Sequence, residues 1–306
     1  MVERASFASY YGRPVIKAPA WEARDIAGYF FLGGLAGAGS VLAAALHAGG
    51  AARTATALKV TSVGSVALAT AALIHDLGVP SRFTHMLRVV KPTSPMSVGS
   101  WLLTVYGPVA GVAAAAAVTG RVPRVGAVAT GGAAVLGPAV ATYTAVLAAD
   151  TAVPAWHGAH RELPYVFAGS ALAAASGAAL LLGPPAETGT ARATAVLGAA
   201  GESLADHAMR RRLGSVAVTL REGRAGRLLR AARTLTAVGA ALAPVAGSRV
   251  AGAAAGAALL AGSVCTRFGV FAAGVASAKD PAHTVEPQRA RLAAAAAGEE
   301  PAVEPG

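Results

Sequence analysis

Charged side chains are scarce in this sequence. Asp, Glu, Lys and Arg together make up 13% of the 306 residues, whereas apolar residues make up 55%. Soluble domains carry roughly 25% charged residues, so a water-soluble protein of this length would lack the polar groups to cover its surface. The mean hydropathy of +0.54 points the same way. The scarcity of charge disfavours an ordinary soluble domain and favours a bundle of helices inside a membrane.

Cysteine is almost absent, which restricts the metal chemistry of the chain. Cys265 is the single cysteine, and one thiol cannot hold an iron–sulfur cluster, a structural zinc ion or an intrachain disulfide. Haem held between two histidines is also disfavoured, because His47 and His75 fall at opposite ends of apolar segments. We therefore expect no metal site, no haem and no iron–sulfur cluster in this chain, and we assign any redox metal to a partner.

The formal net charge of +11 raises nucleic-acid binding as an alternative. The basic residues, however, are spread between apolar runs and have no aromatic platform beside them. Nucleic acid is therefore not an expected partner. Anionic membrane lipids are an expected one, since basic segments next to membrane helices attract their headgroups.

Long apolar runs are what the sequence has in abundance. A bilayer core of about 30 Å is crossed by about 20 apolar residues in a helix. Runs of this kind fall at 25–49, 54–77, 97–119, 124–149, 164–183, 190–206, 231–248 and 250–277. They predict an all-α, polytopic integral membrane protein of about eight transmembrane helices, with its transmembrane domain at 25–278. The flanks are an N-terminal segment, 1–24, without the apolar core of a cleavable signal peptide, and a polar C-terminal tail, 279–306.

Lysine and arginine are distributed unevenly between the two ends of these segments. If all eight segments cross, 19 of the 26 basic residues lie on the side of the termini and six on the other. Cytoplasmic ends of membrane helices carry the excess of positive charge. We therefore expect a multi-pass protein of the bacterial inner membrane with both termini in the cytoplasm. The largest arginine cluster, between residues 207 and 233, is expected to bind lipid headgroups or an acidic partner.

Several stretches of the chain share their pattern with one family. They read YGRPVIK at 11–17, YFFLGGLAGAG at 29–39, DLGVP at 76–80, KPTSPMSVGSW at 91–101, TAVPAWH at 151–157, RELP at 161–164 and RFGVF at 267–271. Together they resemble the polysulfide reductase membrane-subunit family (NrfD/PsrC-like), from about residue 10 to 291. The stretch 76–101 is the most specific. It departs from the family pattern at Val79, where an Arg is common.

The resemblance implies an eight-helix membrane subunit without a redox metal of its own. Such a subunit binds quinone or menaquinone as its substrate. It exchanges electrons with an iron–sulfur, ferredoxin-like subunit, which in turn serves a molybdopterin catalytic subunit. On this resemblance, the chain is one subunit of an oxidoreductase complex in a respiratory electron-transfer chain.

Quinone chemistry needs protonatable groups near the two carbonyls, an apolar slot for the ring and a route for protons. Polar side chains inside a membrane bundle are costly, so each of them is a functional candidate. Tyr143 and Asp150, seven residues apart, share one face of a helix. We expect the first four helices to frame a quinone site at their cytoplasmic ends. The quinone-binding candidates are His75, Asp76, Trp101, Tyr106, Tyr143 and Asp150.

These candidates also have structural interpretations. His75 and Asp76 suit a helix end at the lipid headgroups. Tyr106 and Tyr143 suit helix packing, and Trp101 suits the aromatic belt at the membrane interface. The loops on the same side offer groups for docking the iron–sulfur partner. The docking candidates are Arg82, Lys91, Trp156 and His157.

Glu202 and Arg267 are the deepest charges that the segments predict. A buried ion pair between them, or a proton path through them, is a hypothesis, and its alternative places Glu202 at the cytoplasmic edge. Close helix packing is predicted at two glycine pairs with GxxxG spacing, Gly33/Gly37 and Gly252/Gly256.

Two other functions also fit a helical membrane protein. A transporter would favour inverted repeats and helices broken at mid-membrane, and no repeat stands out in this sequence. A passive anchor would tether catalytic subunits without a quinone site of its own.

Overall fold

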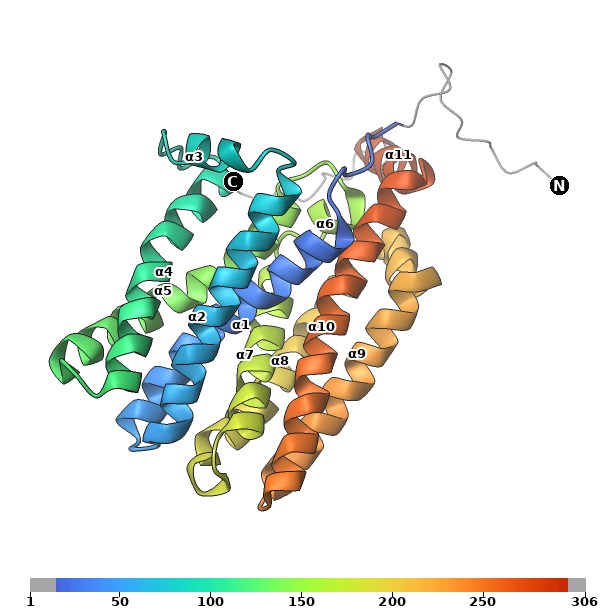
Figure 1. Ribbon diagram of the computed structural model, residues 1–306. Coiled ribbons are helices and arrows are strands. Elements are labelled where there is room, and N and C mark those ends of the chain that lie inside the picture. The colour runs from blue at the N-terminus through green and yellow to red at the C-terminus, as the bar shows by residue number, and fades with distance from the viewer. Residues whose placement is uncertain (1–14, 297–306) are drawn as a thin grey trace.

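The computed structural model describes residues 15–296, and within that range it contains helices and no strand. Eight long helices run side by side through the described part of the chain (Figure 1). They are α1 (Ala23–Ala48), α2 (Ala52–Asp76), α4 (Pro95–Thr119), α5 (Pro123–Ala149), α7 (Leu163–Leu182), α8 (Gly189–Arg212), α9 (Gly223–Leu242) and α10 (Arg249–Lys279). The prediction of an all-α polytopic protein is confirmed.

The short elements gather mostly at one end of the bundle. They are η1 (Pro80–Arg82), α3 (Phe83–Met86), α6 (Pro154–His157), η2 (Pro185–Glu187), η3 (Gly214–Leu220), η4 (Ala243–Val245) and α11 (Ala282–Ala296). We call the end that carries α3, α6 and α11 the motif face (Figure 1), formed by residues 77–94, 150–162, 213–222 and 280–296. The opposite end, the turn face, is formed by residues 49–51, 120–122, 183–188 and 243–248. Helix α1 begins, and α10 ends, at the motif face.

The helices pack as two rings of four. In the first ring α1, α2, α4 and α5 each contact the next and the ring closes from α5 to α1. In the second ring α7, α8, α9 and α10 close in the same order, and α1 packs on α7 between the rings. The first four long helices therefore form one ring, and that this ring frames a quinone site stays a prediction.

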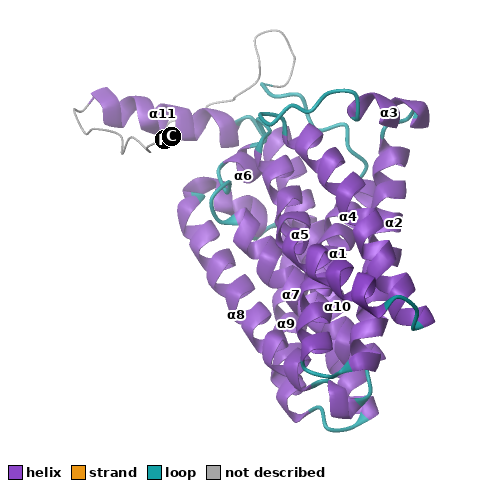
Figure 2. Cartoon of the chain, turned by 90° about the vertical axis from the view of Figure 1, so that its left-hand side faces the viewer, coloured by secondary structure: helices purple, strands orange, loops and turns teal. Residues whose placement is uncertain are grey.

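Seven of the long helices in the described residues are apolar enough to cross a membrane. The exception is α8, which has 24 residues and so measures about 36 Å at 1.5 Å per residue. Its sequence includes Glu202, Asp206 and three arginines at its end. It nevertheless lies in the bundle, against α7 and α9 (Figure 2). Length and position thus agree with an eighth crossing, although composition alone does not select it.

Two expected boundaries were wrong at the arginine-rich stretch. Helix α8 continues to Arg212 instead of ending near 206, and α9 begins at Gly223 instead of 231. Arginine and alanine are good helix formers, and arginine can lay its stem along a helix with its charge at the membrane edge. The arginines therefore interrupt the apolar pattern of the sequence at this point, but α8 and α9 continue through them.

Glycines allow the helices to approach closely where the rings are tightest. A Cβ at Gly37 would clash with the backbone of α5 at Gly137, and one at Gly256 would clash with α7 at Gly177. Gly252 also faces α7, where its Cβ would lie 3.1 Å from the Leu180 carbonyl oxygen. The prediction that the glycine pairs are packing sites is confirmed.

Candidate functional site

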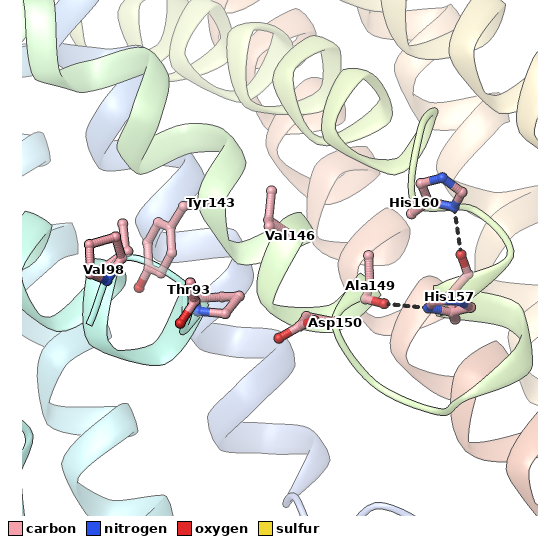
Figure 3. A pocket seen from close by; sticks show the side chains of 10 residues that line it. Thr93, Val98, Tyr143, Val146, Ala149, Asp150, His157 and His160 are labelled. Atoms are coloured by element: carbon pink, nitrogen blue, oxygen red, sulfur yellow. Dashed lines mark hydrogen bonds between the residues drawn. The ribbon is translucent and has the colours of Figure 1, made fainter. Parts of the chain in front are cut away.

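A cavity of about 580 Å³ lies at the motif face, beside the first ring. Helices α4 and α5, the loop before α4 and the segment after α5 line it, and it is open on one side (Figure 3). This volume falls within the range of small-molecule sites, roughly 300–1,000 Å³. Its wall is mostly apolar with a few polar groups, as is usual for such sites. The lining residues are Pro92, Thr93, Pro95, Val98, Tyr143, Val146, Ala149, Asp150, His157 and His160.

Tyr143 is the buried polar residue among those that line this cavity. Its side chain is 8% exposed, and its ring packs edge-on against Tyr29 with the ring centroids 6.1 Å apart. Gly99 on α4 makes room for the ring, because a Cβ there would clash with it. The Tyr143 hydroxyl is buried and has no hydrogen-bond partner among residues 15–296. A buried hydroxyl without a partner is costly, so a ligand that bonded to it would remove this cost.

Asp150 and two histidines supply the outer polar groups of the cavity (Figure 3). Asp150 ends α5 and is exposed. The Nδ1 of His157 donates to the Ala149 carbonyl oxygen at 3.1 Å, and the Nδ1 of His160 donates to the His157 carbonyl at 3.0 Å. These bonds leave Nε2 of His157 as the nitrogen that can exchange a proton. The Tyr143–Asp150 pair predicted from helical spacing does meet at one cavity.

The loop before α4 is fastened to that helix by side chains. Ser97 donates to the Val89 carbonyl and accepts from the Lys91 backbone N–H, each at 3.0 Å. The Trp101 indole donates to the same Val89 carbonyl at 3.4 Å. Trp101 thus holds the loop that walls the cavity and does not line the cavity itself. Lys91 keeps its side chain exposed directly before the lining residue Pro92.

Tyr106 lies inside the first ring, away from the cavity. It is fully buried, and its hydroxyl donates to the Ala36 carbonyl oxygen at 2.6 Å. Because that bond uses its proton, the Ser40 hydroxyl donates to Tyr106 at 2.7 Å. Tyr106 therefore links α4 to α1, and its hydroxyl has two partners.

His75 and Asp76 fasten the end of α2 to the start of α1. The Nδ1 of His75 donates to Asp25 Oδ2 at 2.6 Å, and Asp76 accepts from the Glu22 backbone N–H at 3.0 Å. Glu22, Asp25 and His75 also place ligand atoms within 4.8 Å of one another, a spacing that could hold a metal ion. The short His75–Asp25 distance is that of an ion pair and needs no metal to explain it. Neither His75 nor Asp76 lines the cavity at the motif face.

Trp156 proves to be a core residue. It is 1% exposed, its indole nitrogen donates to the Val270 carbonyl at 2.9 Å, and Trp21 stacks on it with the centroids 5.6 Å apart. Gly274 leaves the space that the indole fills. A buried side chain has no surface for a partner. Of the four docking candidates, Arg82, Lys91 and His157 are exposed.

Glu202 and Arg267 lie in the second ring. Arg267 is fully buried, donates from Nη2 to the Phe167 carbonyl at 2.8 Å and lies 3.7 Å above the Phe167 ring centroid. Glu202 is 7% exposed and accepts from the Thr266 hydroxyl at 2.6 Å. The hypothesis of a direct ion pair was wrong, since no Arg267–Glu202 contact within 4 Å occurs in the described range. Their charges attract each other through space.

Two polar residues that the structure brings into prominence lacked a specific prediction. His160 lines the cavity from the same segment between α5 and α7 as His157, and its position three residues after His157 was the available signal. Lys59 is 6% exposed inside the first ring. It falls within the apolar run 54–77, and a charge inside such a run is itself a signal.

The fold and the cavity define a polytopic α-helical membrane protein with a ligand-sized site at one end of a four-helix ring. The family model "Polysulphide reductase, NrfD" matches residues 20–184, which is more than half of the chain. The chain therefore belongs to this family, whose members are membrane subunits of polysulfide reductase-type complexes. The match contains every residue that lines the cavity and ends before α8. No curated protein matches the chain.

Proposed function

We propose that this chain is the quinone-reactive membrane subunit of an oxidoreductase complex. It exchanges electrons between membrane quinone, or quinol, and an iron–sulfur, ferredoxin-like subunit that serves a molybdopterin catalytic subunit. The observation that carries the proposal is the cavity of about 580 Å³ with Tyr143 at its inner end. The family supports the same reading, because its membrane subunits are associated with quinone.

The cavity residues have complementary chemical roles in this proposal. Val98 and Val146 offer an apolar surface for the quinone ring. The Tyr143 hydroxyl donates to one carbonyl oxygen of the ring. His157 gives or takes a proton through Nε2, and Asp150, which is exposed beside it, passes that proton to water. Oxidation of a quinol releases two electrons and two protons, so the same groups serve either direction of electron flow.

The partner docks at the motif face in this proposal. Arg82 and Lys91 are exposed on the segment that leads into the cavity wall. An acidic iron–sulfur subunit bound there would lie beside the quinone. The chain has one cysteine, so the clusters belong to the partner. We infer from the excess of basic residues at this face that it lies, with both termini, in the bacterial cytoplasm, and that α8 is the eighth crossing.

Quinone binding tests the proposal directly. We expect a short-chain naphthoquinone to bind the purified full-length chain in detergent, and Tyr143→Phe to weaken binding about 2- to 10-fold through loss of one hydrogen bond. Tyr165→Phe is the matched control, because Tyr165 is 70% exposed and lies outside the cavity. His75→Ala should leave the affinity unchanged, since His75 does not line the cavity.

Other outcomes would favour other functions. Absence of naphthoquinone binding to the unmodified chain would favour the passive anchor. Binding that is unchanged in Tyr143→Phe would remove Tyr143 from the site. Uptake of a solute by vesicles that contain the chain alone would favour a transporter.

A proton path through Glu202 and Arg267 stays a separate prediction. A cavity of about 20 Å³ lies against Glu202, Asp206 and Arg210 between α8, α9 and α10. It supports a route from the motif face to Glu202. Glu202→Gln should slow quinone turnover without weakening quinone binding, if this route carries protons.

A further inference from the structure

A second set of cavities lies in the first ring, at the turn face. The outer one measures about 200 Å³ and is lined by His47, Thr56 and Lys59 among small residues of α2, α4 and α5. The inner one measures about 10 Å³ and is lined by Ser40, Lys59 and Thr130. Lys59 belongs to both, so it separates the outer cavity from the inner one.

Lys59 is an unusual residue for this position. It is 6% exposed and lies seven residues into α2, about 10 Å from the start of that helix at 1.5 Å per residue. No carboxylate lies within 4 Å of its amine anywhere in residues 15–296. Ionisable side chains in membrane bundles are costly and mark ion and proton pathways. His47 is the other titratable group of the outer cavity.

Beyond Lys59, towards the middle of the membrane, lies a series of hydroxyl groups. A cavity of about 10 Å³ is close to the smallest that holds one water, and such a water needs two to four polar partners. Ser40, Lys59 and Thr130 provide three. The Ser40 hydroxyl then donates to Tyr106, whose hydroxyl donates to the Ala36 carbonyl oxygen. Tyr106 lies 13 residues from the turn-face end of α4, about 20 Å along it.

The line points towards the quinone cavity at the other end of the same ring. Tyr106 is seven residues, about 10 Å, along α4 from Gly99, on which the Tyr143 ring packs. The hydroxyl of Ser62, one helical turn beyond Lys59 on α2, and that of Thr144, next to Tyr143 on α5, are buried without hydrogen-bond partners among the described residues. One ring thus holds a ligand cavity at the motif face and a polar entrance at the turn face.

We propose that Lys59, Ser40 and Tyr106 form a proton half-channel between the turn face and the interior of the first ring. The inference rests on the proposed quinone function and adds to it the face of the membrane at which protons are released or taken up. When quinol is oxidised, its two electrons pass to the iron–sulfur partner at the motif face, one proton leaves by way of His157 and Asp150, and the other proton leaves through this line to the turn face. In the reverse direction, one of the two protons enters by the same line as quinone is reduced.

Proton release by the assembled complex is the decisive measurement. Membrane vesicles of both orientations receive quinol and an electron acceptor, and a pH indicator on each side reports protons released per electron. We expect Lys59→Met to lose proton release at the turn face while electron transfer with an uncoupler and naphthoquinone binding persist. Arg53→Met is the matched control, because Arg53 is an exposed cation of the same helix and should change nothing.

Thiol labelling tests the entrance without any quinone chemistry. With Cys265→Ser as background, Lys59→Cys and Thr56→Cys should react with a charged, membrane-impermeant thiol reagent added at the turn face. Val60→Cys is the control: Val60 is 48% exposed on the outside of the ring, where lipid excludes such a reagent. The labelling experiment also tests the entrance if Lys59→Met fails to fold.

The outcomes separate this proposal from the quinone function. Naphthoquinone binding with unchanged proton release in Lys59→Met overturns the half-channel and keeps the quinone site. An unlabelled Lys59→Cys overturns it as well. Labelling together with unchanged proton release shows a cavity that only stores water or an anion, and also overturns it. Absence of naphthoquinone binding to the unmodified chain removes the quinone function instead.

Discussion

At the scale of single residues, the second ring holds two opposite charges that are compensated through space. The Arg267 guanidinium donates a hydrogen bond to the Phe167 carbonyl oxygen and lies above the Phe167 ring. The Glu202 carboxylate accepts a hydrogen bond from the Thr266 hydroxyl. Glu202 Oε2 and Arg267 Nε and Nη1 have no hydrogen-bond partners among the residues that the structure describes. Removing either charge alone leaves the other buried without compensation, which is costly in a protein interior.

A double-mutant cycle measures this coupling. We expect Arg267→Met to lower the free energy of unfolding, and Glu202→Gln in the same chain to restore part of the loss, with a coupling of about 1–2 kcal/mol. Thermal unfolding of the four chains in detergent provides the values. Strictly additive effects would show that the two charges do not interact.

The sequence predicted some of these residues and missed others for identifiable reasons. Tyr143 and Asp150 were predictable, because helical periodicity places both on one face of α5. The burial of Trp156 was not, since it depends on a loop that folds back against Gly274 of α10. Lys59 received no prediction of its own, although it falls inside an apolar run. A contact between distant segments, such as His75 with Asp25, leaves no local pattern.

At the scale of helices, α8 depends on glycine for its place in the bundle. A Cβ at Gly198 would lie 2.6 Å from the Ala173 backbone nitrogen, and one at Gly169 would clash with the Glu202 backbone. Helices α7 and α8 therefore pack with their backbones in near contact, which is the usual role of small residues in membrane bundles. This packing holds a helix of ordinary polarity between apolar neighbours.

A matched pair of substitutions on α8 tests this packing. Gly198→Ala should lower the midpoint of thermal unfolding, because the new methyl group displaces the α7 backbone. Gly201→Ala should keep the midpoint or raise it, since a Cβ there meets nothing within 4 Å in the described structure and alanine favours the helix by about 1 kcal/mol. Equal effects of the two substitutions would contradict the packing.

The hydropathy pattern predicted some helix boundaries well and others poorly. The six clearest apolar runs predicted their helices to within a few residues, because a bilayer-length run has few other conformations. The sixth and seventh runs were cut short at the arginines. A hydropathy pattern detects the apolar face of a helix, and it cannot detect a polar continuation such as the first turns of α9.

At the scale of the whole molecule, the eight long helices place the start of α1 and the end of α10 at the same face. Cysteine labelling tests this topology in a Cys265→Ser chain. Ser81→Cys and Ser215→Cys should react with an impermeant reagent from the cytoplasm, and Ala186→Cys from the opposite side, as all three positions are exposed. If α8 did not cross, Ser215→Cys and Ala186→Cys would react from the same side.

Assembly of the proposed complex depends on the same sidedness. The exposed cations Arg82 and Lys91 lie on the segment that leads into the cavity wall, so in the proposed complex a partner held there would receive electrons over a short path. The Lys91 backbone, not its ammonium, bonds to Ser97. Reversing the charge of that side chain should therefore weaken docking without loosening the loop.

Charge reversal at the two faces separates docking from a general effect of charge. We expect Arg82→Glu together with Lys91→Glu to weaken binding of the iron–sulfur subunit about tenfold, mostly at low salt, because rim charges act through long-range attraction that salt screens. Arg121→Glu together with Arg124→Glu, at the turn face, should leave binding unchanged. Iron content of the affinity-purified chain measures the outcome. Loss of iron only in the turn-face variant would place the partner on the opposite side, and the quinone cavity would then lie across the membrane from its electron acceptor.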